Sequence, residues 1–130
     1  MKKITLLVLL VISTNFFAQS NTEVFLLDIV KKNNKIELIN LINISNNEGY
    51  DNQPTFYDNN TVLFSSTRNN QTDIKSYTIN RNESSWKTNT SFGNEYSPLK
   101  IPNKEIVSAV RLDENGLQRL YQYDFSTGMS

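Results

Sequence analysis

Large apolar residues alternate with polar ones along several short stretches of the chain. Three five-residue stretches share this template: residues 25–29, 75–79 and 121–125. In the second stretch, Lys75 replaces the first apolar residue. Alternation with a period of two, in aromatic and β-branched residues, is typical of a strand with one buried face. Turns rich in Asn, Asp and Gly separate these stretches, and no sustained 3.6-residue stripe follows residue 20. The pattern predicts an all-β protein.

The N-terminus has a different pattern. Lys2 and Lys3 precede an apolar run over residues 4–12, and a polar stretch follows. This layout predicts a helical secretory signal peptide over residues 1–19, cleaved after Ala18 or Gln19. A membrane anchor is the alternative, but a spanning helix needs about 20 apolar residues. We therefore expect a periplasmic or secreted protein with no membrane span after cleavage.

The chain also repeats itself at a longer interval. Two segments, beginning at Gly49 and Gly93, each have an acidic residue two positions later and a proline five positions later. The prolines, Pro54 and Pro98, are 44 residues apart. Each proline is followed by an apolar run that reaches an arginine, Arg68 in the first segment and Arg111 in the second. Intervals of this size are typical of β-propeller blades, which have about 40–45 residues.

Residues 52–68 and 73–77 resemble the WD40-like repeat of TolB-type propellers. That repeat contains a proline, an aromatic residue, a turn, an apolar strand, Ser-x-Arg and then Asp-Ile-Tyr. The second repeat is more divergent, because Gln118-Arg119-Leu120 stands where Asp-Ile is expected. The resemblance covers nearly the whole chain after the signal peptide. The residues that carry it as a structural repeat motif are Pro54, Ser66, Arg68, Asp73, Pro98 and Arg111.

The resemblance implies a partial propeller of two to three four-stranded antiparallel blades over residues 20–130. TolB-type rings are six-bladed, so we expect this chain to hold part of a ring, completed by missing sequence or by several copies. One blade is expected over residues 50–92, with strands at 54–57, 61–66, 73–79 and 85–90. An incomplete first blade is expected from strands at 23–29 and 35–42, and an incomplete last blade over residues 93–130.

Composition excludes several kinds of chemistry. The chain has no Cys and no His, which excludes thiolate nucleophiles, Ser-His triads, disulfides and the usual zinc ligand sets. Lys plus Arg equals Asp plus Glu at 13 each, so the chain lacks the basic excess of nucleic-acid binders. We expect no metal, no cofactor and no nucleic-acid partner.

Five charged residues are candidates for chemistry. Arg68 and Asp73 could line a ligand-binding mouth, but a feature repeated in every blade favours a structural hydrogen bond across two strands. Asp113 precedes Asn115-Gly116, so we expect it in a solvated turn. Asp51 and Glu95 precede the two prolines near the expected channel mouth. They are candidates for a partner or cation site, or for turn caps.

Three aromatic residues are candidates for contacts. Tyr50 and Tyr96 stand next to the two acids and are the expected exposed contacts. Trp86 is the only tryptophan, and its type suits either an interface or packing between blades.

These features predict a non-enzymatic exported scaffold that binds a protein, a peptide or an envelope glycan. One alternative is the propeller portion of a larger exported enzyme, a prolyl-oligopeptidase-type peptidase whose catalytic domain lies elsewhere. That enzyme would need a Gly-x-Ser-x-Gly elbow and a His. Another alternative is an exported sensor or sugar-binding protein.

Overall fold

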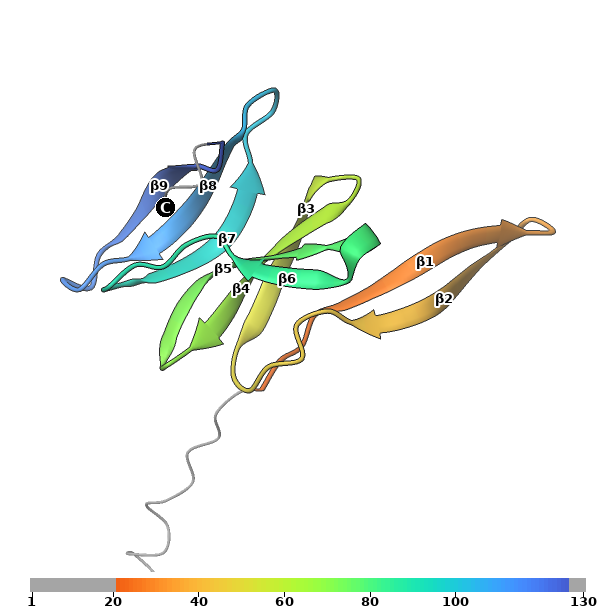
Figure 1. Cartoon of the computed structure of the whole chain (residues 1–130), viewed down its shortest axis with the longest axis horizontal. Coiled ribbons are helices and arrows are strands. Elements are labelled where there is room, and N and C mark those ends of the chain that lie inside the picture. Colours follow the sequence, from red (N-terminus) through yellow and green to blue (C-terminus); the bar gives the residue numbers. More distant parts are fainter. Residues whose placement is uncertain (1–20, 127–130) are drawn as a thin grey trace, which may run out of the picture.

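A computed structural model describes residues 21–126, and this part consists of three antiparallel sheets (Figure 1). The prediction of an all-β fold is confirmed, since the described residues contain strands, one 3-10 turn (η1, Ile79–Arg81) and no α-helix. The expected signal peptide, residues 1–19, lies outside the described residues. Within residues 21–126, no helix is long and apolar enough to cross a membrane.

Within each sheet, strands that are consecutive in the chain pair with each other. The first hairpin is β1–β2, the middle sheet is β3–β4–β5–β6, and the last sheet is β7–β8–β9. The strand bounds are β1 Phe25–Lys32, β2 Lys35–Asn43, β3 Asp51–Asp58, β4 Thr61–Arg68, β5 Gln71–Thr78, β6 Glu83–Trp86, β7 Asn94–Lys100, β8 Ile106–Leu112 and β9 Gln118–Asp124. The first hairpin projects away from the other two sheets (Figure 1).

The outermost strand of the middle sheet is shorter than expected. Sequence pattern predicts a strand over residues 85–90, whereas β6 ends at Trp86. The backbone N–H groups of Lys87 and Thr88 both donate to the Ile74 carbonyl, at 2.8 and 3.3 Å. Because two consecutive donors share one acceptor, the chain leaves the ladder at this point and turns toward β7.

Two bulges interrupt β3 and β7 at equivalent positions. The register shifts between Asn52 and Thr55 in β3, and between Tyr96 and Leu99 in β7. The residue before each proline has a positive φ, 56° at Gln53 and 52° at Ser97. A proline has no N–H to donate to a ladder, so a strand that contains a proline tends to bulge at that position. The repeated proline therefore corresponds to a repeated backbone feature.

Two hydrophobic cores lie on opposite faces of the middle sheet. Val62, Phe64 and Tyr77 pack against residues at the base of the first hairpin, Val24 and Ile44. Leu63 and Ile74, on the other face, pack against Val107 and Ala109 of the last sheet. The two faces follow from the alternation of side chains along a strand. The middle sheet is therefore buried on both sides, unlike the other two.

The register corrects one feature of the sequence repeat. Asp51 lies opposite Ser66 in the β3–β4 ladder, and Glu95 lies opposite Arg111 in the β7–β8 ladder. Arg111 therefore occupies the position of Ser66, and Arg68 lies two residues further along its strand. Both arginines lie near the end of an apolar strand, so the sequence pattern alone assigns them to equivalent positions of the repeat.

Candidate functional site

The candidate residues gather at one end of the sheets. Because neighbouring strands are antiparallel, the beginnings of β3, β5 and β7 lie beside the ends of β4 and β8 (Figure 1). We call this end A. Its connecting segments are residues 44–50, 69–70, 87–93 and 113–117, and the opposite end is end B.

Tyr50 and Tyr96 meet at end A. Their ring centroids are 6.3 Å apart and the rings are nearly perpendicular, at 74°. Such edge-to-face contacts are favourable and join the beginning of the middle sheet to that of the last sheet. Both side chains are only partly exposed. The two residues expected as exposed contacts are thus in part packed against each other.

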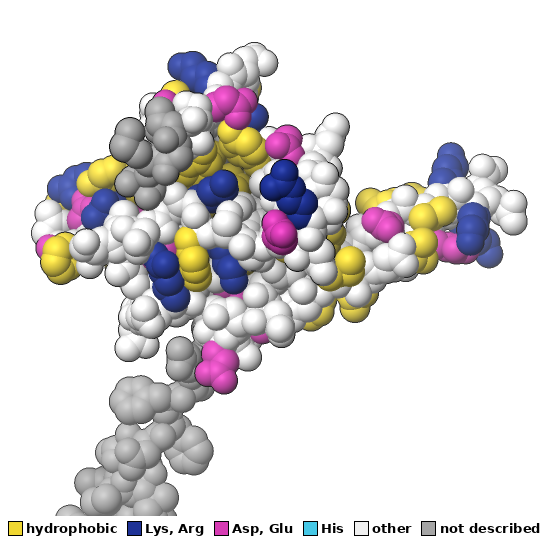
Figure 2. Space-filling view, viewed as in Figure 1, with side chains coloured by type: hydrophobic (Ala, Val, Ile, Leu, Met, Phe, Trp, Pro, Cys, Tyr) yellow, Lys and Arg dark blue, Asp and Glu magenta, His cyan; other side chains and the backbone are white. Residues whose placement is uncertain are grey.

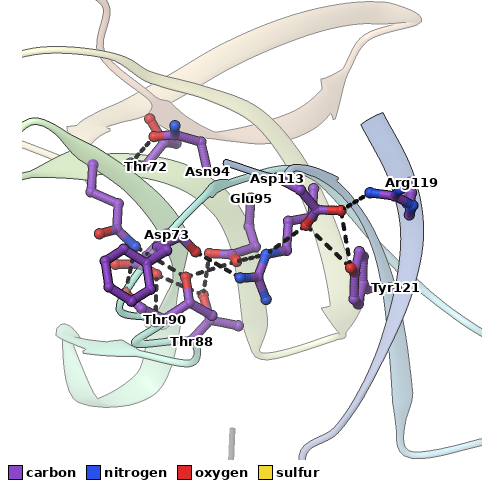
Figure 3. A network of polar contacts seen from close by, with 12 residues as sticks. Thr72, Asp73, Thr88, Thr90, Asn94, Glu95, Asp113, Arg119 and Tyr121 are labelled. Carbon is purple, nitrogen blue, oxygen red and sulfur yellow. Dashed lines mark hydrogen bonds and ion pairs between the residues drawn. The ribbon is translucent and has the colours of Figure 1, made fainter. Parts of the chain in front are cut away.

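Asp51 and Glu95 face the protein interior, with relative exposures of 1% and 0%. Glu95 accepts hydrogen bonds from Thr90 Oγ1 at 2.9 Å and Tyr123 Oη at 3.4 Å, and Arg111 Nε lies 3.6 Å from it (Figure 3). Burial, first of all, and the neighbouring Asp73 raise the pKa of Glu95, while Thr90 and Arg111 oppose the shift; the result is a pKa of about 7.

Asp73 joins the same network from β5. Arg68 donates to Asp73 Oδ2 from Nε at 3.1 Å and from Nη2 at 3.0 Å. The other carboxylate oxygen, Oδ1, accepts from Thr88 Oγ1 and from the Thr90 N–H, both at 3.3 Å. The Arg68 guanidinium also lies over the Trp86 ring, 4.4 Å from its centroid. Trp86 therefore packs under a cation, which accounts for its partial burial.

A matching network lies at the base of the first hairpin. Ser45 Oγ donates to Glu23 Oε2 at 2.6 Å and accepts the Val24 N–H at 2.9 Å. In the second network Thr88 Oγ1 likewise donates to Asp73 and accepts the Ile74 N–H at 2.8 Å.

The partner of the buried acid is also repeated. Asn47 Nδ2 lies 3.5 Å from Asp51 Oδ1, as Thr90 Oγ1 lies beside Glu95. Burial raises the pKa of Asp51 as well. The same arrangement thus occurs at both junctions between sheets, which is typical of a structural element that repeats with the fold.

Asp113 is part of the polar cluster rather than of a solvated turn. Its side chain is 15% exposed, and Arg111 Nε lies 3.2 Å from its Oδ1. Tyr121 Oη donates to it at 3.1 Å, and Arg119 is a further ion-pair partner (Figure 3). The sequence-based expectation missed this because the two cationic partners come from β8 and β9, which flank the turn.

The two prolines of the repeat differ in exposure. Pro98 is buried, whereas Pro54 is exposed. Between them, Ser97 N–H donates to Gln53 Oε1 at 2.8 Å and to Ser65 Oγ at 3.2 Å. The two bulges are therefore in direct contact, and together they attach β7 to the middle sheet.

The chain matches no protein-family model and no curated protein sequence. In residues 21–126, no group of three or more acidic side chains is placed to hold a metal ion. A carboxyl with a pKa near 7 is a common sign of acid-base chemistry. Glu95 is completely buried, however, so an external substrate has no access to it.

End A has an accessible polar surface. An open hollow is lined by Asn47, Glu48, Thr67, Arg68, Asn69 and Asn70. Asn69 and Asn70 form the β4–β5 turn with φ values of 49° and 61°, a conformation that Asn tolerates. Amide side chains carry both donors and acceptors, so this surface suits a polar ligand.

Several residues of the network were not found from the sequence: Glu23, Ser45, Asn47, Thr88, Thr90 and Tyr123. One signal was present, because Ser45-x-Asn47 and Thr88-x-Thr90 are 43 residues apart, close to the interval of the prolines. Small hydroxyl and amide residues are frequent in this chain, so the spacing was not conspicuous.

Proposed function

We propose that this chain is a non-enzymatic, exported β-propeller repeat protein that acts as a binding scaffold in the cell envelope. Its three sheets are successive blades, and end A carries the ligand-binding loops. The ligand is a peptide segment of a protein, or an envelope glycan.

The repetition of the buried carboxylates carries this proposal. Asp51 and Glu95 occupy the same register position in two sheets and have equivalent partners. A catalytic site is normally unique, whereas an element that recurs at each junction serves the fold. The charged network therefore supports a scaffold, and recognition is left to the exposed loops.

The open hollow at end A supports the assignment of the ligand. Asn69, Asn70 and Glu48 are exposed, and Arg68 lies partly exposed behind them with its charge held by Asp73. Peptide backbones and sugar hydroxyls both offer alternating donors and acceptors, which amide side chains can pair with.

The test compares two turns of the same conformation. Asn69→Gly with Asn70→Gly removes the amides from end A, while Asn33→Gly with Asn34→Gly removes the same groups from a turn at end B. Both turns have positive φ at both positions, so glycine preserves each backbone. The full chain is immobilised, and soluble peptidoglycan fragments and peptides from digested envelope proteins are passed over it.

We expect the unsubstituted chain and the end B variant to retain the same fragments. The end A variant should retain several-fold less, because its hollow has lost the pairing groups. Equal retention by the two variants, or turnover of any of these fragments by the purified chain, would contradict the proposal.

A further inference from the structure

The base of the first hairpin and the last sheet pack on opposite faces of the middle sheet. Val62 pairs with Tyr77 on the face of the middle sheet that packs on the first hairpin. Val107 pairs with Tyr123 on the face of the last sheet that packs on the middle sheet. We call this the front face of each sheet, and the opposite face the back face. The last sheet thus places its front face on the back face of the middle sheet, and the middle sheet places its front face on the base of the first hairpin.

The back face of the last sheet has no such cover among the described residues. Ser65 pairs with Ile74 on the back face of the middle sheet, and Val110 pairs with Leu120 at the same register position of the last sheet. Ile74 is 0% exposed beneath the last sheet, whereas Leu120 is 71% exposed. Of these two apolar residues at equivalent positions, Ile74 has another sheet above it and a further strand, β6, beside it, whereas Leu120 lies uncovered in the edge strand β9.

The front face of the first hairpin is exposed in the same way. Val24 and Leu26 point toward the middle sheet, so the alternate residues of β1 lie on the front face. Figure 2 shows apolar side chains along this projecting hairpin. The exposed ones on the front face of both strands are Phe25 (49%), Leu27 (39%), Ile29 (75%), Ile36 (71%), Leu38 (61%) and Leu41 (63%).

We propose that the chain associates with a second copy of itself, head to tail. The front face of the first hairpin of one copy packs on the back face of the last sheet of the next copy. This contact repeats the arrangement that joins the last sheet to the middle sheet, a front face packed on a back face. Each copy carries both halves of the contact.

The physical reason is the removal of apolar surface from water. Patches of this kind, larger than the few apolar residues scattered over an ordinary surface, mark interaction sites. A two-stranded hairpin is also only marginally stable alone, so the first hairpin gains order from a cover on its front face. Because the two surfaces are different, the contact is heterologous and generates a ring or an open chain of copies.

The test uses one lysine substitution in each face. Leu120→Lys places a charge in the back face of the last sheet, and Ile29→Lys places one in the front face of the first hairpin. Leu117→Lys is the matched control, since Leu117 is 53% exposed in the β8–β9 turn and belongs to neither face. Mass is measured by light scattering after size exclusion over a series of concentrations of the full chain. Fluorescence of Trp86 verifies that each variant is folded.

We expect the unsubstituted chain and Leu117→Lys to form dimers or larger assemblies. The Leu120→Lys and Ile29→Lys variants should each be monomeric. An equimolar mixture of these two variants should form dimers and nothing larger, because each retains the half that the other has lost. A contact between identical faces would not recover in this way.

Two results would overturn the proposal: a monomeric unsubstituted chain, or a mixture that stays monomeric. Either would indicate that the two faces are covered by something other than a second copy, such as further sheets of a longer chain. The proposal goes beyond ligand binding at end A and does not depend on it. The end A glycine variant should therefore associate normally, so the two proposals can fail separately.

Discussion

The two junctions between sheets follow one plan but satisfy their buried acids differently. At the first junction Asp51 faces Ser66, and Asp51 Oδ2 has no hydrogen-bond partner in the described part of the chain. At the second junction Glu95 faces Arg111 and shares its surroundings with Asp73. The buried acid is thus common to both junctions, while the group opposite it changes. The acid belongs to the repeat, and its partner is local.

The apolar side chains at the two junctions also differ, and here the first junction has the larger one. Phe64 fills the first junction, whereas Ala109 stands at the equivalent position of the second. The second junction has the larger polar network, and the first has a buried phenylalanine where the second has an alanine. The first junction should therefore be the more sensitive to loss of volume, and the second to loss or gain of charge.

The largest expected effect comes from making the first junction resemble the second. Phe64→Ala places at the first junction the residue that the second has naturally. Phe64 is 0% exposed, and truncation of a buried Phe costs about 3–5 kcal/mol of folding free energy. For a chain of this size, that loss should abolish most of the cooperative transition in urea denaturation.

Phe56→Ala is the control for this substitution. Phe56 is 61% exposed on β3, so its truncation should lower the free energy of unfolding by less than about 1 kcal/mol. Equal effects of the two variants would show that the apolar content of the first junction does not depend on Phe64.

A smaller effect is expected from pH, and it should appear at the second junction. The pKa of Glu95 is raised from its ordinary value of 4.5 to about 7. Between these values the folded chain binds more protons than the unfolded chain. The contribution of Glu95 to stability is therefore complete below pH 4.5 and is lost as the pH rises through 7. Its size should be on the order of 3 kcal/mol.

Glu95→Gln tests this, since Gln imitates the protonated carboxyl and does not titrate. Urea midpoints of the variant should fall less between pH 5 and pH 8 than those of the unsubstituted chain. Glu23→Gln is the comparison at the first junction, because its pKa is lowered, first of all by the hydrogen bond from Ser45. The contribution of Glu23 is lost only as the pH falls below 4.5, so this variant should keep the original slope. Identical slopes for all three proteins would contradict the role given to Glu95.

The sequence predicts the strands well and the contacts between them poorly. Period-two alternation identifies the all-β fold, and Pro54 and Pro98 identify two equivalent strands, because both signals are local. The register of Arg111 depends on the pairing of β7 with β8 across a longer connection than the β3–β4 turn, and the sequence pattern does not reveal this pairing. Closure of the sheets into a ring stays a prediction.

The candidate site was predicted in part. Asp51 and Glu95 were identified as equivalent acids, but their burial depends on how the sheets stack. The hydroxyl groups of Ser45 and Thr88 were missed, since each comes from the segment that follows its sheet and reaches its carboxylate partner, Glu23 or Asp73, only when the chain folds back. Residues that act across a junction give no periodic signal in either strand.

The smallest expected change in the free energy of unfolding comes from the two bulges. They have the same backbone conformation, but they contribute different groups to the contact between the sheets. Gln53 and Ser97 both have a positive φ, a conformation that costs a residue other than glycine about 1–2 kcal/mol. Ser97 contributes its backbone N–H to the contact, while Gln53 contributes its side-chain oxygen. Ser97→Gly should therefore keep the hydrogen bond and relieve the backbone, raising the free energy of unfolding by about 0.5 kcal/mol.

Gln53→Gly relieves the same backbone conformation but removes the acceptor for Ser97 N–H and for Ser65 Oγ, which donates to it at 3.1 Å. Loss of these two bonds, one between the sheets and one within the middle sheet, costs about 1–2 kcal/mol of folding free energy, which exceeds the gain. The two glycine variants should thus shift the urea midpoint in opposite directions. Stabilisation by both would mean that the contact between the bulges contributes nothing, and that the sheets are held together by the apolar core and the buried acids alone.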